Sequence, residues 1–401
     1  MKSKPKISVF MVAYNQEKYI GRAIKSVIEQ ETIFDFELII ADDCSTDSTR
    51  QIINNYKEKY PQQIRTLFND VNIGSQRNFS KIIEFCKGEY IAILDGDDFW
   101  TSQNKLSKQV EFLEEHAHLA ISFHRVKVFY NDQSKPSYTI PIYAEPTQEL
   151  SINDLFNDYF LPSSSVMFRA GLIHDLPDWF FDLPFGDKPL YMLLAQFGKI
   201  GYIDEEMSAY RIHQEGIWSL KHFDRMEYFL QKKIDLLQYF DDFTSNIYHD
   251  EIMQGISRYR ISLAIEKGKR LDELDAYKLL QDEVLKQNKL LGLKNMSFNR
   301  KVVIFGTGQF ALNVIKMCEI LQISILFCVD NNKLRWGEEI NDIPVKPPMS
   351  LLDTYSEDVI ILIASMYYYE IANQLNLMGF IENDQYYNGL DVNFMLKIVQ
   401  K

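Results

Sequence analysis

The stretch Tyr90-Ile-Ala-Ile-Leu-Asp-Gly-Asp-Asp-Phe-Trp100 decides the fold of this chain. Its apolar first half predicts a buried β-strand, and three carboxylates follow, Asp95, Asp97 and Asp98. In an extended backbone Asp95 and Asp97 point to the same side. Because clustered carboxylates repel one another, they usually face a cation. Oxygen ligands of this kind suit Mg2+ or Mn2+, whereas the competing interpretation is an acidic turn without a ligand.

Strand and helix patterns alternate four times in the first hundred residues, which is typical of a parallel sheet with helices on both faces. The expected strands and helices before the acidic turn span residues 7–13, 17–30, 36–41, 47–59, 64–68 and 75–87. Ligands bind such sheets at the carboxyl ends of the strands. Tyr14, Asp43 and the acidic turn all follow strand ends, so we expect them to meet at one edge of the sheet.

Composition excludes several classes of function. The chain of 401 residues has a formal net charge of −13, from 43 basic and 56 acidic residues, which argues against nucleic-acid binding. No apolar run reaches membrane-spanning length, and no signal peptide is recognised at the N-terminus. Four scattered cysteines show no zinc spacing, and Cys318 and Cys328 are expected in the core. These features predict a reduced, cytoplasmic protein.

The pattern after the acidic turn divides the chain further. A helix is expected over 103–116, a strand pair or bent strand over 119–130, a helix over 187–198 and an extended segment over 200–211. Residues 221–291 are charged and helical in pattern, and a new α/β pattern begins at Asn299. We therefore expect a catalytic domain over 1–220, a helical connector over 221–298 and a small α/β domain over 299–401.

Four motifs, in this order, give the first half of the chain a resemblance to a known family. They are Ile7-Ser-Val-Phe-Met-Val-Ala-Tyr-Asn15, Glu37-Leu-Ile-Ile-Ala-Asp-Asp-Cys-Ser-Thr-Asp47, Gly88-Glu-Tyr-Ile-Ala-Ile-Leu-Asp-Gly-Asp-Asp98, and Gly186-Asp187 with Tyr210-Arg-Ile-His213. Residues 5 to about 219 resemble the family 2 glycosyltransferases, which have the A-type nucleotide-sugar fold. The resemblance implies an enzyme that transfers a sugar from a nucleotide diphosphate sugar to an acceptor hydroxyl.

The resemblance also implies which residues bind the donor. Tyr14 would lie against the face of the base, and Asp43 would accept the N–H of uracil or a similar base. Asp95 would reach the ribose or the metal, Asp97 would bind the Mn2+ or Mg2+ ion, and Asp98 would hold a water or orient the loop. The structural alternative for Tyr14 is an ordinary half-buried side chain.

Four further residues are expected near the donor by the same resemblance. Arg77 would lie near the phosphates, although a solvated surface arginine is the alternative. Arg211 and His213 would contact the diphosphate, and Trp218 would stack on a donor or acceptor sugar. A structural role remains the competing interpretation for His213.

Asp187 is the expected general base. It stands where the family carries this group, directly before a helix, and would take the proton of the acceptor hydroxyl in a single displacement that inverts the anomeric centre. Partial desolvation by the preceding Leu183-Pro-Phe185 segment would raise its pKa, which suits the role. Gly186 departs from the family, since many relatives carry a second acid there. The alternative for Asp187, helix capping, is compatible with catalysis.

The C-terminal segment resembles small Rossmann-like modules appended to bacterial sugar-processing enzymes. Gly306-Thr-Gly308 follows a strand and opens a helix, and Asp330 lies about 24 residues on, near the spacing of a dinucleotide fingerprint. These residues mark a candidate nucleotide site. The alternatives are a role in assembly, and glycines that only permit close packing of helix and sheet.

Three other functions compete with this interpretation: a nucleotidyltransferase, a non-catalytic nucleotide-sugar-binding or scaffolding subunit, and an oxidoreductase led by the C-terminal module. A nucleotidyltransferase would need a glycine-rich, basic loop where the chain has Ala13-Tyr-Asn-Gln-Glu17. The expected partners are a nucleotide diphosphate sugar and a carbohydrate or glycoconjugate acceptor of bacterial surface polysaccharide synthesis. Neither peripheral association with the inner face of the membrane nor homo-oligomerisation is excluded, and no nucleic acid is expected as a partner.

Overall fold

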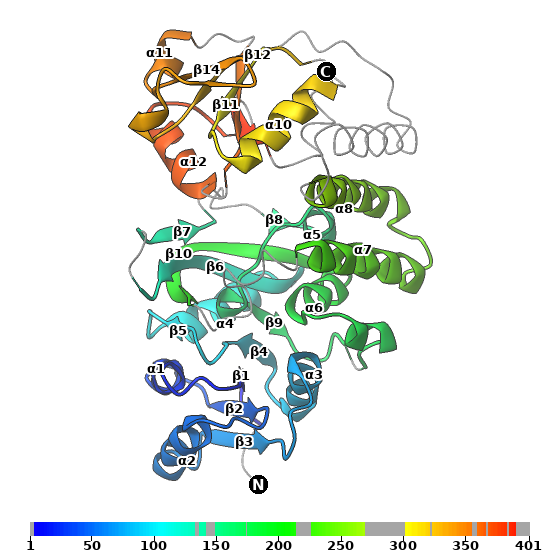
Figure 1. Cartoon of the computed structure of the whole chain (residues 1–401). Helices are drawn as coiled ribbons and strands as arrows, with labels where there is room; N and C mark the ends of the chain where they lie inside the picture. The colour runs from blue at the N-terminus through cyan, green and yellow to red at the C-terminus, as the bar shows by residue number, and fades with distance from the viewer. Residues whose placement is uncertain are drawn as a thin grey trace. The chain divides into compact units, whose positions relative to one another are not determined.

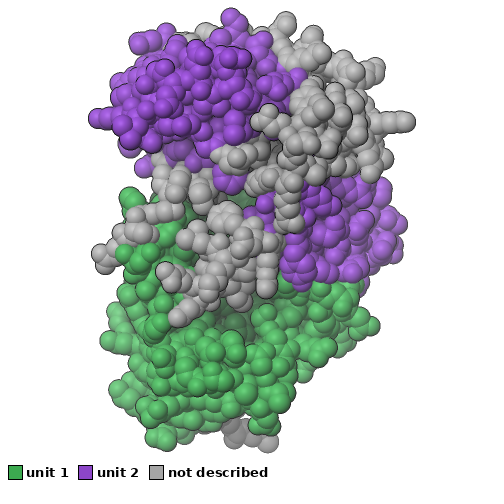
Figure 2. Space-filling view, viewed as in Figure 1, with its two compact units in different colours: residues 1–225 green, residues 226–401 purple. Residues whose placement is uncertain are grey.

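The computed structural model describes residues 4–132, 136–141, 149–173, 175–213, 226–268, 301–320, 323–354, 359–365, 368–382 and 385–389. The chain divides into two compact units, residues 1–225 and 226–401, which Figure 2 distinguishes by colour. Neither the predicted boundary at 220 nor the one at 298 lies within the described residues, so both stay predictions.

The first unit is built around one mixed sheet. Its elements in chain order are β1 (Ile7–Ala13), α1 (Ile20–Ile28), β2 (Phe36–Asp42), α2 (Thr49–Lys59), β3 (Ile64–Phe68), α3 (Ser75–Phe85), β4 (Tyr90–Ile93), β5 (Phe99–Trp100), α4 (Lys105–Glu115), β6 (Leu119–Tyr130), β7 (Tyr138–Ile140), β8 (Glu149–Leu150), α5 (Ile152–Phe156), η1 (Ser163–Ser165), β9 (Met167–Arg169), η2 (Asp178–Asp182), α6 (Asp187–Leu194) and β10 (Lys199–Ile212). Figure 1 labels the helices α1–α6 and the strands β1–β10 along the chain.

The strand order in this sheet is β3-β2-β1-β4-β9-β6-β10-β5, with β7 paired to β6 and β8 to β10. β1 to β4 pair in parallel, as predicted. β9 is antiparallel to β4 and β6, and β5 is antiparallel to β10, so the parallel arrangement does not extend through the whole sheet. β5 follows β4 directly after the acidic turn, but it does not pair with β4. It pairs with β10 at the edge of the sheet, and the two strands run in opposite directions.

Helix α1 shows why these elements form where they do. Its buried residues Ile20, Ala23, Ile24 and Val27 recur at helical spacing and pack in one apolar cluster with β1, β2, β4 and α4. The helix begins at Ile20, three residues later than the pattern predicts. Helix α3 contacts β1 and β2, and its Phe79 packs edge-on against Phe10 of β1.

A glycine brings the acidic turn close to β1. A Cβ atom at Gly96 would lie 2.3 Å from Gln16 Oε1 and 3.2 Å from the carbonyl oxygen of Val12. Any side chain at position 96 would therefore push the turn away from the end of β1. The glycine between Asp95 and Asp97 is explained by this close approach.

The second unit holds two long helices and a smaller sheet. Its elements are α7 (Met226–Phe243), α8 (His249–Gly268), β11 (Lys301–Phe305), α10 (Gln309–Ile320), β12 (Ile325–Val329), η4 (Lys333–Arg335), β13 (Glu339–Ile340), β14 (Ile343–Lys346), α11 (Ser350–Thr354), β15 (Val359–Ile363), α12 (Tyr368–Leu377) and β16 (Tyr386–Asn388). The sheet order is β13-β14-β12-β11-β15-β16. Its five strands β14, β12, β11, β15 and β16 are parallel, and only β13 pairs antiparallel.

Helices α7 and α8 agree with the predicted helical connector over the described part of 221–298. Helix α8 is more than a connector, however, because Ile261 and Ala264 belong to the same buried cluster as β11, β12 and β15. Cys318 and Cys328 are fully buried in this cluster, as expected. Among the helices that the structure describes, none has the length and apolar character needed to cross a bilayer.

Candidate functional site

Three carboxylates converge after β4. Asp98 is almost fully buried, and its Oδ1 accepts a hydrogen bond of 2.8 Å from the backbone N–H of Arg211. Its Oδ2 is buried without a hydrogen-bond partner among the described residues. Asp95 is half-buried and accepts a hydrogen bond from the hydroxyl of Ser163 in η1. Asp97 is also half-buried and directs its Oδ2 toward His213.

These carboxylates make the site strongly anionic. Burial, then the charge of Asp97, raises the pKa of Asp95 to about 7, and Asp187 adds to the rise against the opposing hydrogen bond from Ser163. Burial, then the charges of Asp97 and Asp95, raise the pKa of Asp98 well above its usual value. Clustered carboxylates with hard oxygen donors fit a divalent cation, although among the described residues no group of three or more His, Cys, Asp or Glu is arranged to hold a metal ion.

The motif at the end of β10 closes against the acidic turn. Nε2 of His213 lies 3.1 Å from Oδ2 of Asp97, and Nδ1 is buried without a hydrogen-bond partner among the described residues. Nε of Arg211 donates to the carbonyl oxygen of Asp97 at 2.9 Å. The rings of Tyr19 and His213 contact each other at a tilt of 53°, with their centroids 4.6 Å apart. The structure thus brings both predicted residues of this motif to Asp97.

Asp187 is the first residue of α6, as predicted. Its Oδ1 accepts a hydrogen bond of 2.8 Å from the N–H of Lys188, and its side chain is half-buried. The acids Asp98, Asp97, Asp95 and Asp187 all raise the pKa of Tyr210, after burial, which is the largest cause. The chain therefore brings the expected base and the acidic turn around one tyrosine, although α6 and β4 are far apart in sequence.

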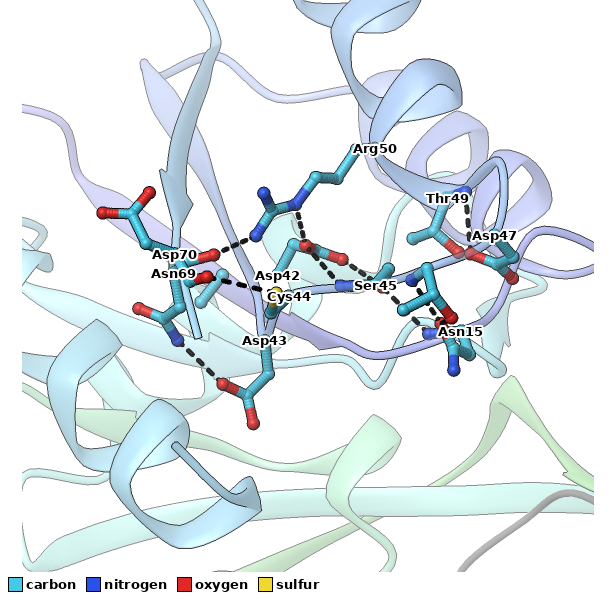
Figure 3. Close-up of polar contacts among 12 residues, drawn as sticks. Asn15, Asp42, Asp43, Cys44, Ser45, Asp47, Thr49, Arg50, Asn69 and Asp70 are labelled. Atoms are coloured by element: carbon cyan, nitrogen blue, oxygen red, sulfur yellow. Dashed lines mark hydrogen bonds and ion pairs between the residues drawn. The ribbon is translucent and has the colours of Figure 1, made fainter. Parts of the chain in front are cut away.

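The ends of β1 and β2 are tied together by polar loops, which Figure 3 shows in close-up. Asp42 is fully buried and forms an ion pair with Arg50. The hydroxyl of Ser45 accepts from the N–H of Asn15, and Asp47 accepts from the N–H of Thr49. These contacts hold the loops after β1 and β2 together.

Asp43 anchors a neighbouring loop. Its Oδ1 accepts from Nδ2 of Asn69 at 3.0 Å and from the N–H of Ile73 at 2.8 Å, while Oδ2 accepts from the N–H of Gly74 at 2.9 Å. The side chain is 3% exposed. Since each carboxylate oxygen has two acceptor positions, only one position on Oδ2 remains for a further donor. Tyr14 is 48% exposed at the end of β1.

Two other predicted donor-site residues are less defined. Arg77 lies in the first turn of α3 and is exposed. Trp218 lies outside the described residues. The ring of Trp100 is buried, and its Nε1 donates to the carbonyl oxygen of Ser164 at 3.0 Å, so this residue belongs to the core.

Sequence reasoning missed two residues that shape the site. The hydroxyl of Ser163, for which the sequence analysis makes no prediction, donates a hydrogen bond to Asp95. Gln76 of α3 was not noticed, yet its Nε2 donates to the carbonyl oxygens of Phe180 and Phe185, just before Asp187. Gln76 is buried and its neighbour Arg77 is exposed, but both are polar, so the sequence alone does not show which of them points inward. The run of three serines was the one available signal for Ser163.

The predicted C-terminal nucleotide site has its own geometry. Gly306 has a φ of 122°, and a Cβ there would lie 2.7 Å from the carbonyl oxygen of Ala364, whereas a Cβ at Gly308 would meet nothing within 4 Å. Asp330 accepts hydrogen bonds from the hydroxyl of Thr307 and the N–H of Asn332. The loop therefore uses this carboxylate internally, and the nucleotide site stays a prediction.

A sheet whose parallel strands end in Tyr14, Asp43 and the Asp95–Asp98 turn defines an A-type glycosyltransferase fold. Residues 8–176 match the model of Glycosyl transferase family 2, so this part of the chain is a family 2 domain, and Asp187, Arg211 and His213 lie beyond the match. Residues 298–385 match the model described as C2185-like, N-terminal. The predicted Rossmann-like assignment of that segment is not tested by this match.

Relatives extend the comparison. An uncharacterised protein of Mycobacterium tuberculosis (strain ATCC 25618 / H37Rv) is 37% identical over 226 residues, which are 55% of this chain and 63% of that protein. TuaG of Bacillus subtilis (strain 168), named for a glycosyltransferase of teichuronic acid biosynthesis, is 41% identical over 120 residues, 30% of this chain and 46% of its own. The match thus spans less than two thirds of each of these relatives.

A solved structure shares the fold. The crystal structure of Staphylococcus aureus TarS 1-349 aligns with a TM-score of 0.51 at 20% identity, covering 72% of this chain and 84% of that one. At this identity the likeness concerns the fold alone.

Proposed function

We propose that this protein is an inverting, metal-dependent glycosyltransferase that moves a sugar from a nucleotide diphosphate sugar to an acceptor hydroxyl. The observation that carries the proposal is the convergence of Asp187 with the acidic turn of a family 2 domain, around Tyr210. One-step sugar transfer requires a proton acceptor for the attacking hydroxyl. In a metal-dependent enzyme it also requires acids that hold the metal beside the diphosphate. A relative named for teichuronic acid biosynthesis supports a surface polysaccharide as the product.

Asp97, with Asp95, would hold the Mn2+ or Mg2+ ion. When bound, the metal would supply positive charge against the diphosphate that leaves. His213 would position Asp97 through the contact at 3.1 Å, and its Nδ1 would face the diphosphate. Asp98 would keep the turn in place, because its Oδ1 holds the backbone of Arg211.

The donor would be a UDP-sugar. The free acceptor position on Oδ2 of Asp43 would take the N–H of uracil, a charge-assisted hydrogen bond that selects the base. The exposed ring of Tyr14 offers a flat face for stacking. Arg77 would approach the phosphates from α3. Trp218 would stack on the donor or the acceptor sugar.

Asp187 would accept the proton of the acceptor hydroxyl as that oxygen attacks the anomeric carbon. The bond between that carbon and the diphosphate breaks in the same step, so the configuration inverts. Lys188 restrains the carboxylate through its backbone N–H. We place the reaction in the cytoplasm, at the inner face of the membrane, and we retain the C-terminal Gly306–Asp330 loop as a candidate nucleotide site.

A panel of nucleotide sugars tests this proposal. The full chain is incubated with each donor and Mn2+, with and without carbohydrate acceptors, and release of the nucleotide diphosphate is measured. Release from a UDP-sugar that rises with acceptor supports the proposal. Donor binding without any release under all conditions would favour a non-catalytic subunit. Formation of a nucleoside triphosphate and a sugar 1-phosphate when pyrophosphate is added would favour a nucleotidyltransferase.

A further inference from the structure

The first unit contains a pocket separate from the acidic turn. It has a volume of about 430 Å3, within the range of small-ligand sites of roughly 300 to 1,000 Å3. Strands β5, β6 and β10, helix α1 and the segment before β7 supply its walls. Its lining residues are Arg22, Phe99, Thr101, Lys127, Phe129, Tyr130, Ser137 and Ala209. Asp187 does not line it, so the pocket does not hold a reacting hydroxyl.

Two cations face this pocket in a protein that is acidic as a whole. Arg22 and Lys127 are both exposed, and neither forms an ion pair with an acid of the described residues. The guanidinium of Arg22 lies 3.4 Å from the ring centroid of Phe99, and that of Arg211 lies 5.6 Å from the same centroid. Positive charges gathered without acidic partners favour an anionic ligand.

The rest of the lining is aromatic and hydroxylated. Phe99 and Phe129 pack edge to face with centroids 5.8 Å apart, and Tyr130 extends this aromatic surface. Thr101 and Ser137 add hydroxyl groups that can donate and accept hydrogen bonds. Flat apolar faces beside hydroxyls suit the ring of a sugar, which has apolar C–H faces and a polar edge. Inorganic phosphate would use only the cations.

The pocket also touches the acidic turn through one side chain. Phe99, which lines the pocket, directly follows Asp98. Arg211, whose guanidinium lies 5.6 Å from the ring centroid of Phe99, donates to the carbonyl oxygen of Asp97. The guanidinium of Arg211 lies 4.9 Å from the ring centroid of Phe129. A ligand in the pocket would therefore be next to, but outside, the site proposed for the donor.

We propose that this pocket binds an acidic sugar unit of the acceptor, at a distance from the hydroxyl that reacts. The anionic group lies between Arg22 and Lys127, and the sugar ring lies against Phe99 and Phe129. This inference rests on the proposed glycosyltransferase function. It adds the class of acceptor, an anionic saccharide.

Binding of simple probes to the full chain tests the site without any turnover. Glucuronic acid, glucose 6-phosphate, glucose and inorganic phosphate are titrated and followed by NMR of the ligand, in the absence of donor. We expect the two acidic sugars to bind, glucose to bind at least tenfold more weakly, and phosphate more weakly than glucose 6-phosphate. Lys127→Gln and Arg22→Gln should each weaken the acidic sugars about tenfold, whereas Lys25→Gln, an exposed change on α1, should leave them unchanged.

Two results would overturn the proposal: equal binding of glucose and glucuronic acid, or acidic-sugar binding that both pocket variants leave intact. Phosphate binding as tight as glucose 6-phosphate would also overturn it, because the sugar ring would then contribute nothing. Binding of the donor is measured in the same samples. Failure of the acidic sugars with intact UDP-sugar turnover rejects only this pocket, whereas absence of turnover with intact acidic-sugar binding rejects only the proposed function.

Discussion

Gln76 occupies the space that a side chain at position 186 would need. A Cβ atom at Gly186 would lie 2.7 Å from Oε1 of Gln76, and the amide of Gln76 is held in place by two carbonyl oxygens. The resemblance to family 2 glycosyltransferases implies an acid at this position in many relatives. The buried Gln76 accounts for the glycine at position 186, and Asp187 is the acidic residue in the first turn of α6.

We expect Gly186→Ala to lower the free energy of unfolding by about 1 to 3 kcal/mol, the usual cost of overpacking. Urea denaturation of the full chain measures the change. Gln76→Ala alone also destabilises, because it leaves two buried carbonyl groups unpaired. The double variant should be more stable than the sum of the two single effects predicts, since the closest contact, with Oε1 of Gln76, is then gone and only the contact with Phe79 at 3.0 Å remains. Strict additivity would show that the two positions do not meet.

The second prediction concerns Asp187. Asp187→Asn removes the proton acceptor but keeps the shape of the side chain and its position beside Lys188. We expect kcat for sugar transfer to fall about 10²- to 10⁴-fold, with the Kd of the nucleotide sugar unchanged. Asp182→Asn in η2, an exposed carboxylate in the same region, is the matched control. Retention of transfer in Asp187→Asn would remove this residue from the mechanism.

Metal dependence is the third prediction. Treatment with EDTA should abolish transfer, and added Mn2+ or Mg2+ should restore it. Asp97→Asn should raise the metal concentration needed for half-maximal rate at least tenfold, because it removes one negative ligand. Asp70→Asn, an exposed acid outside the turn, should behave as the unchanged chain does. Full activity after exhaustive chelation would contradict a role for metal.

Local patterns predicted the strand ends but not the contacts among them. β1, β3 and the start of β2 were placed to the residue because their apolar runs end in polar loops. The position of Asp187 at the start of a helix followed from the family resemblance. By contrast, the bond from Ser163 to Asp95 joins residues 68 apart, and the antiparallel β9 depends on tertiary packing. Neither leaves a periodic trace in the sequence. The hydrogen bonds from the N–H groups of Ile73 and Gly74 to Asp43 could not be predicted either, because they join segments 30 and 31 residues apart.

A buried lysine provides the last prediction. Lys105 is fully buried in α4; its Nζ donates to Oε1 of Gln109 at 2.6 Å and lies 4.2 Å from the ring centroid of Trp100. Burial lowers the pKa of Lys105 well below its usual 10.5. The folded state thus binds this proton less readily than the unfolded state does. Stability contributed by this site is therefore lowest at low pH and rises as pH increases from the folded pKa toward 10.5.

Lys105→Met, which nearly conserves volume, removes this titration. We expect the free energy of unfolding of the natural chain, measured relative to that of Lys105→Met, to increase as pH rises from 7 to 9. The increase is up to about 1.4 kcal/mol per pH unit. His124 is also buried with a lowered pKa, but it is neutral in both states above pH 7 and so adds no slope. Urea denaturation at three pH values measures the difference. A constant difference across this range would mean that the folded and unfolded states bind the Lys105 proton equally, and that the buried side chain keeps its charge.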